Sequence, residues 1–348
     1  MLYPNKLFSG YHGNGSCHCQ GIAVDTEKGY IYYSFTTRLV KMDFEGNVIG
    51  SVKGLIGHLG CISFCKADRK IYGSLEFKND SIGKGILSSL GLNLSGVTTA
   101  FYCAVFDVDK IDRPDMDAEK DGIMRAVYLK DVIEDFDAEV TVNGKKYPHK
   151  YACSGVDGIS FGPAFDGSGK TVLCICYGIY GDIEREDNDY QVILCFDATG
   201  FWDMALPLRQ DNMHQNGIYC QNKYFLYTGN TRWGVQNLEY DPYTETWLAC
   251  VYKGEKPKFP NYSLFMIDSK KPPIKEKHIP YGEDIEVLSL ANEGSYFPLG
   301  ATGVYSFGNG YFYFSKIGTD AEKGQYTDVF LYRYDNGEFT AADSPMEF

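Results

Sequence analysis

The sequence predicts an all-β chain folded as a five-bladed β-propeller, with four-stranded antiparallel blades around a central channel. Three observations support this prediction. Five segments share one strand pattern, and a second apolar strand follows the first in each segment. A third strand then ends in Asp every time. Small sheets repeated in this way bury their faces by stacking around an axis. The aligned apolar anchors of the five first strands are Ile22, Ile62, Ile159, Leu238 and Val304.

The repeated aspartates close the third strand of each segment, at Asp43, Asp107, Asp197, Asp268 and Asp335. Hairpins favour Asp and Gly there, because these residues supply turn hydrogen bonds and positive φ. A catalytic residue is needed only once in a chain. Their strict repetition therefore predicts turn residues.

The 348 residues form one domain in this interpretation, because one closed propeller uses them all. We expect blades at 12–57, 58–153, 154–233, 234–299 and 300–348, with 1–11 completing the last blade. Segment 77–99 reads as a Gly- and Ser-rich loop, and the helix signal is strongest at 131–135. Segment 207–234 reads as an insertion with an outer strand at 224–228, since a whole blade does not fit there.

The amino-acid composition limits the classes of partner that the chain can bind. The net charge of −13 argues against nucleic acid and anionic membrane surfaces, which attract clustered Lys and Arg. No segment reaches the roughly 18–20 apolar residues of a membrane span, and no signal peptide is recognisable at the start. Many of the 11 Cys lie within strands, as small apolar residues do. We expect reduced thiols and a cytoplasmic protein.

The channel mouth is where the inner strands begin, and the aligned register places large polar groups and Gly there. One repeat position holds His18, His58, Gly155, Gly234 and Gly300. The position two residues later holds Gln20, Gly60, Asp157, Gln236 and Thr302. Gly at the mouth leaves room for a ligand.

Three interpretations of the histidines stay open. With His214 on a connecting loop, His18 and His58 would form a site for a divalent metal ion such as Zn, Mn, Fe or Ca. They would equally serve as catalytic acid and base, since His titrates near neutral pH. Duplicated imidazoles also cap strands without any chemical role. No nucleotide cofactor is expected, because no phosphate-binding loop is present.

Carboxylates supply a second set of catalytic candidates, Asp157 and Glu239. Glycoside hydrolysis needs two carboxyl groups across a cleft, one protonated and one ionised. The substrate-binding candidates are Gln20, Gln236, Arg38, Arg185, Arg232 and Trp233. Arginines bind a carboxylate bidentately, which favours a sugar acid, and aromatic rings suit the apolar faces of sugars.

The five repeats resemble the broad group of lactonase-like and NHL-like propellers, and the fold is similar to that of five-bladed glycosidases. The lactonase-like enzymes bind one divalent metal on the axis through Glu, Asn and Asp, where this chain offers His, Gln and Asp. Glycosidase propellers bring a carboxylate from the first blade's inner strand, where this chain has His18 and Gln20. The resemblance implies a propeller, and its motifs are generic.

Two functions follow from these observations. The first is a carbohydrate-active hydrolase or lyase, a metal-dependent glycosidase, lyase or lactonase, acting on a small sugar or sugar acid at the channel mouth. The second is a non-catalytic propeller that binds a glycan or a protein through the same face. Fold alone does not separate them, because propellers host both.

Overall fold

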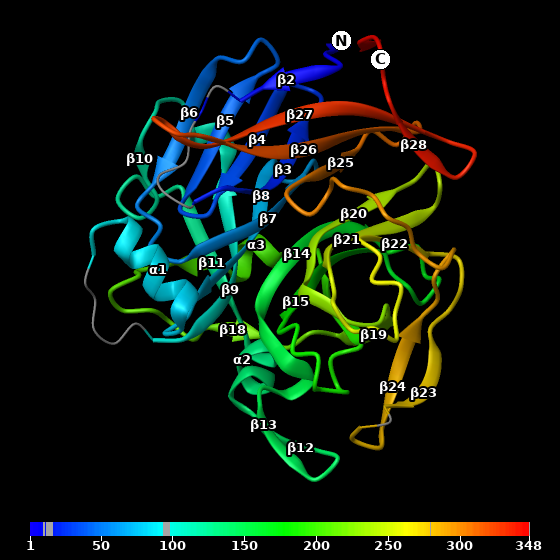
Figure 1. The fold of residues 1–348 in the computed structure, drawn as a ribbon. Coiled ribbons are helices and arrows are strands. Elements are labelled where there is room, and N and C mark those ends of the chain that lie inside the picture. Colours follow the sequence, from blue (N-terminus) through cyan, green and yellow to red (C-terminus); the bar gives the residue numbers. More distant parts are fainter. Residues whose placement is uncertain (10, 12–16, 93–97, 279, 348) are drawn as a thin grey trace.

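The computed structural model describes residues 1–9, 11, 17–92, 98–278 and 280–347. Five sheets stand around a central axis as the blades of a β-propeller (Figure 1). The predicted fold class is therefore confirmed. In the part of the chain described, no helix combines the length and the apolar character needed to cross a membrane.

Blade one is the most compact sheet. It runs outward from the axis through β3 (Cys19–Asp25), β4 (Tyr30–Phe35), β5 (Arg38–Asp43) and β6 (Val48–Lys53). The short β10 (Met116–Asp117) adds a parallel edge to β6. That edge strand comes from a long excursion of blade two, which also forms η1 (Val108–Lys110), so the first two blades are tied together.

Blade two contains β7 (His58–Cys65), β8 (Lys70–Phe77), β9 (Ala100–Asp107) and β11 (Met124–Leu129). Two short strands, β17 (Leu206–Pro207) and β18 (Gly217–Ile218), pair with β11. The segment expected to be a loop contains α1 (Ser81–Ser89). The Asp80 side chain caps this helix by accepting from Gly83 N at 2.9 Å.

Blade three has the largest sheet. Its strands are β14 (Cys153–Pro163), β15 (Thr171–Ile179), β16 (Tyr190–Asp197), β19 (Asn222–Tyr227), β24 (Glu283–Leu288) and β23 (Ile274–His278). Before β14 come α2 (Lys130–Asp137), the hairpin β12 (Glu139–Val142) and β13 (Lys145–Pro148), and η2 (Lys150–Ala152); α3 (Phe201–Met204) follows β16. The segment 222–227, read as an outer strand, pairs antiparallel with β16.

Blades four and five complete the ring. Blade four has β20 (Thr231–Asp241), β21 (Thr246–Lys253) and β22 (Leu264–Asp268). Blade five has β25 (Val304–Ser306), β26 (Tyr311–Asp320) and β27 (Gly324–Asp335). Both β2 (Lys6–Phe8) and β28 (Glu338–Ala341) pair with β27, while β1 (Leu2–Tyr3) pairs with β29 (Met346–Glu347). Segments from the two ends of the chain thus lie side by side at the last blade (Figure 1).

The inner strands carry the shared apolar anchors into the core, and all five anchors are buried. Four inner strands also change register near their starts, at Cys19/Gly21, Leu59/Ile62, Val156/Ile159 and Val235/Asn237. A β-bulge re-aims the side chains around it. The bulges therefore separate a mouth segment of each inner strand from the core segment below it.

All 11 cysteines are free thiols in the structure, and most are buried. Cys174 and Cys176 both pack in one apolar cluster with Trp247.

Candidate functional site

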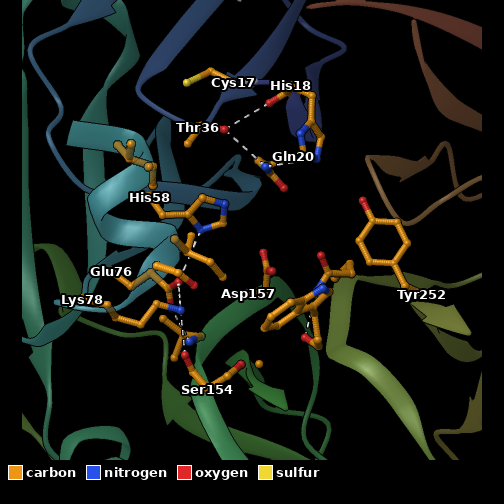
Figure 2. Close-up of a pocket in the computed structure, with 18 residues that line it drawn as sticks. Cys17, His18, Gln20, Thr36, His58, Glu76, Lys78, Ser154, Asp157 and Tyr252 are labelled. Carbon is orange, nitrogen blue, oxygen red and sulfur yellow. Dashed lines mark hydrogen bonds and ion pairs between the residues drawn. The ribbon is translucent and has the colours of Figure 1, made fainter. Parts of the chain in front are cut away.

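A cavity of about 480 Å³ opens where the inner strands begin. Blades one to four contribute to it from β3, β7, β14 and β20, and α1 covers one side (Figure 2). The residues that line it are Cys17, His18, Gln20, Thr36, His58, Glu76, Lys78, Ser81, Ile82, Gly85, Ile86, Ser154, Val156, Asp157, Gly178, Trp233, Gln236 and Tyr252. We call this space the mouth cavity.

Two glycines make room for the carboxylates of the mouth cavity. A Cβ on Gly155, whose φ is +131°, would lie 1.9 Å from Glu76 Oε2. A Cβ on Gly60 would lie 2.4 Å from Asp157 Oδ1. Any larger residue at either position would displace a carboxyl group, so glycine here serves the shape of the site.

Asp157 is the buried acid of the mouth cavity. Its side chain points into the open space (Figure 2), and the residue is only 8% exposed. Within the described part of the chain, Oδ1 has no hydrogen-bond partner. Burial, with a further contribution from Glu76, holds the pKa of Asp157 well above its ordinary value. The carboxyl group is therefore protonated at a higher pH than an ordinary aspartate and can donate a proton to a bound ligand.

Glu76 and Lys78 form a buried ion pair beside Asp157. Lys78 Nζ lies 2.6 Å from Glu76 Oε1 and donates to Ser154 O at 2.8 Å. Glu76 Oε2 accepts from Val156 N at 3.1 Å. Burial alone would lower the pKa of Lys78, but the neighbouring Glu76 carboxylate outweighs it and raises that pKa. Burial raises the pKa of Glu76, and Lys78 offsets part of this rise.

Sequence reasoning missed this ion pair. Lys78 belongs to the segment 77–99 that the sequence predicts as a loop, and Glu76 directly precedes that segment. Residues i and i+2 of a strand share one face. Extending the second strand through Phe77 would have placed both charges on the same side, facing the mouth.

His58 contacts the ion pair from above. Its Nδ1 lies 3.6 Å from Glu76 Oε1 and has no hydrogen bond in the described structure. Burial, together with Lys78 and His18, lowers the pKa of His58 to about 3. The imidazole is therefore neutral at physiological pH, where it can bind a ligand by hydrogen bonding without carrying charge.

The remaining polar side chains at the rim of the mouth cavity form hydrogen bonds with neighbouring rim residues. Gln20 Nε2 lies 3.3 Å from His18 Nε2 and 3.3 Å from Thr36 Oγ1 (Figure 2). Gln236 Nε2 donates to Trp233 O at 2.8 Å. Gln20, Gln236 and Trp233, predicted to bind substrate, thus lie at one cavity together with His18, His58 and Asp157.

His214 lies elsewhere. Its ring packs edge-on against Tyr102 of blade two, and its carbonyl accepts from the Tyr102 hydroxyl at 2.6 Å. His214 does not line the mouth cavity. Among the described residues, no three His, Cys, Asp or Glu side chains are grouped to hold a metal ion. The predicted set of His18, His58 and His214 does not fit a metal centre, and we derive no chemical step through one.

Glu239 is at the other end of the channel from Asp157. It lines a second cavity of about 1020 Å³, formed where the inner strands end. Ser160 Oγ and Ser306 N donate to its carboxylate, each at 3.0 Å. Burial raises the pKa of Glu239 to about 8. The two carboxylates named as a catalytic pair therefore do not face one cleft.

The three predicted arginines are apart from the mouth cavity. Arg38 Nη1 pairs with Asp115 at 2.5 Å. Arg185 is buried against Asp187 at 2.6 Å and donates to Pro148 O at 2.7 Å. Arg232 lines a small neighbouring groove with Trp233. The expected arginine clamp is therefore not assembled at this site.

Comparisons with solved structures return propellers. A GH43 β-1,3-galactosidase with galactodeoxynojirimycin is 12% identical, with a TM-score of 0.43, over 96% of this chain and 98% of that one. A GH43 endo-arabinanase from Bacillus licheniformis is 11% identical, with a TM-score of 0.41, over 97% and 100%. A glucose dehydrogenase is 10% identical, with a TM-score of 0.40, over 94% and 98%. No family model and no curated protein matches the chain. We take nothing about the chemistry of the mouth cavity from these likenesses.

Proposed function

We propose that this chain is a carbohydrate-active hydrolase that cleaves a small sugar or sugar acid in the mouth cavity, with Asp157 as its general acid. One observation carries the proposal. Asp157 is buried and lines the cavity, and its Oδ1 has no hydrogen bond among the described residues. A protonated carboxyl group in that position is suited to donate its proton to a leaving oxygen.

Glu76 is the second carboxyl group that the reaction needs. Burial raises the pKa of Glu76, but Lys78 at 2.6 Å supports its ionised form, and we assign the charge to Glu76 and the proton to Asp157. This division of roles is the one that glycoside hydrolysis uses. It replaces Glu239 by Glu76 as the partner of Asp157.

The proposed reaction balances with these two groups. The bond between the anomeric carbon and the leaving oxygen breaks as Asp157 donates its proton to that oxygen. The oxygen of a water molecule bonds to the anomeric carbon, and its proton passes to Glu76. Solvent then returns a proton to Asp157 and removes one from Glu76, which restores the starting state.

The walls of the mouth cavity suit a sugar. Trp233, Tyr252 and Ile86 supply apolar surface, and Gln20 and Gln236 supply amide donors and acceptors. Sugars combine apolar ring faces with polar rims, which such a mixture of side chains recognises. Neutral His58 adds a hydrogen-bonding group beside the acids.

The test is a screen of aryl glycosides and short oligosaccharides with wild type, Asp157→Asn and Glu76→Gln. Asp284→Asn makes the same carboxyl-to-amide change at a surface position and is the matched control. We expect turnover in wild type and in the control, and a loss of about 10²-fold or more in the other two. Binding without product in wild type would overturn the proposal in favour of a glycan-binding propeller. An unsaturated product would identify β-elimination, and the chain would then be a lyase.

A further inference from the structure

A groove of about 810 Å³ runs from the mouth cavity outward between blades four and five. Tyr252, near the end of β21, lines both spaces. The cavity and the groove are therefore adjacent along one side chain. A ligand in the mouth cavity that extends past Tyr252 would enter the groove.

The groove has aromatic walls open to solvent. Tyr296 is 66% exposed, while Phe330 and Tyr332 are half-buried. Grouped exposed rings mark ligand-binding grooves more often than scattered ones do. Ring faces of this kind stack on sugar rings, so the groove continues the character of the mouth cavity.

Two lysines give the groove a positive charge. Lys253 and Lys316 both line it and are exposed. Neither forms an ion pair within the part of the chain that the structure describes, although the chain has 46 Asp and Glu against 33 Lys and Arg. Asp328 lies opposite Lys316 in the sheet and interacts with it electrostatically, while its carboxylate pairs with Lys6 at 3.8 Å. The groove thus retains cationic groups on a strongly anionic protein.

We infer that the substrate is an oligosaccharide bearing carboxylate groups, whose cleaved end occupies the mouth cavity and whose further sugars lie in this groove, with their carboxylates on Lys253 and Lys316. This inference rests on the proposed function for the mouth cavity. It extends that function by specifying that the substrate is an oligosaccharide and that it is negatively charged. Charge complementarity selects the occupant, because carboxylates attract the two exposed ammonium groups and a neutral glycan does not.

Binding measurements test the groove separately from turnover. The probes are tetramers of galacturonate, mannuronate and glucuronate, their monomers, and the tetramers with carboxyl groups reduced to alcohols. Calorimetry uses the Asp157→Asn background, in which the probes stay intact. The groove variants are Lys253→Gln and Lys316→Gln, singly and together. Lys275→Gln removes the same charge from β23 of blade three and is the matched control.

We expect at least one acidic tetramer to bind about tenfold more tightly than its monomer and its reduced form. The double lysine variant should lose this advantage and keep the affinity for the monomer, and Lys275→Gln should keep both. The groove inference is overturned if no acidic tetramer exceeds its monomer, or if the double variant retains the full advantage. Turnover of small neutral glycosides would then still support the proposed function. Tight tetramer binding without turnover in wild type would instead overturn the function and leave the groove standing.

Discussion

Lys78 Nζ lies 2.6 Å from Glu76 Oε1, and both side chains are almost completely buried. The pair stands beside Asp157, whose pKa is raised by burial and by Glu76, while Lys78, the Cys61 backbone and Gln236 offset part of that rise. Lys78 therefore lowers the pKa of two neighbouring acids, Glu76 and Asp157. Burial raises the pKa of both acids, and Lys78 offsets more of this rise at Glu76, which it contacts directly.

Lys78→Met should destabilise the protein strongly. The substitution removes the partner of a buried carboxylate, and breaking such a pair typically costs about 3–5 kcal/mol. Denaturant unfolding measures the loss. Glu76→Gln combined with Lys78→Met removes both charges and should recover much of it. Equal stability of the single and double variants would show that the charges are not coupled in the folded protein.

Asp157→Asn should affect turnover according to the leaving group. Substrates with poor leaving groups need the proton of Asp157, whereas aryl glycosides with acidic phenols need it less. The variant should therefore lose more activity on the former. In wild type, activity should fall as the pH rises through the elevated pKa of Asp157. A uniform loss across leaving groups, with the alkaline limb unchanged, would remove Asp157 from the role of acid.

Gly155→Ala should be far more harmful than an ordinary glycine replacement. Its added Cβ would lie 1.9 Å from Glu76 Oε2, so the strain of the positive φ is joined by displacement of the carboxylate. Gly122→Ala is the matched control, because its φ is +64° and no atom lies within 4 Å of the added Cβ. The control should cost about 1 kcal/mol. We expect Gly155→Ala to exceed it in thermal unfolding and to lose activity.

Glu239 should make stability depend on pH. Its folded pKa of about 8 lies above the ordinary glutamate value, so the folded state holds a proton that the unfolded state releases. The contribution is complete at acid pH below the unfolded pKa. It is lost progressively as the pH rises toward and through about 8. Unfolding free energies across this range should decline less steeply in Glu239→Gln than in wild type. Parallel curves would show that the pKa of Glu239 is not raised in the folded protein.

The sequence by itself determined the architecture. Each blade must bury the same face of its inner strand. An apolar residue therefore recurs at the same position of each repeat, as at Ile22, Ile62 and Ile159. The same register placed His18, His58 and Asp157 at the start of inner strands, and the structure brings them to one cavity. The position of a residue along its inner strand depends only on the local sequence, so aligning the repeats was enough to predict it.

Only the tertiary structure decided which acids meet. Asp157 and Glu239 both belong to inner strands, but Asp157 lies within the bulge of β14 and Glu239 lies beyond the bulge of β20, so they line cavities at opposite ends of the channel. Glu76 reaches Asp157 from a different blade through the space left at Gly155. The pairing of β19 with β16, and the presence of Lys253 and Lys316 at one groove, likewise bring together segments that are separate in the sequence. Such contacts depend on how the blades stack. The strand pattern of a single repeat contains no information about that stacking.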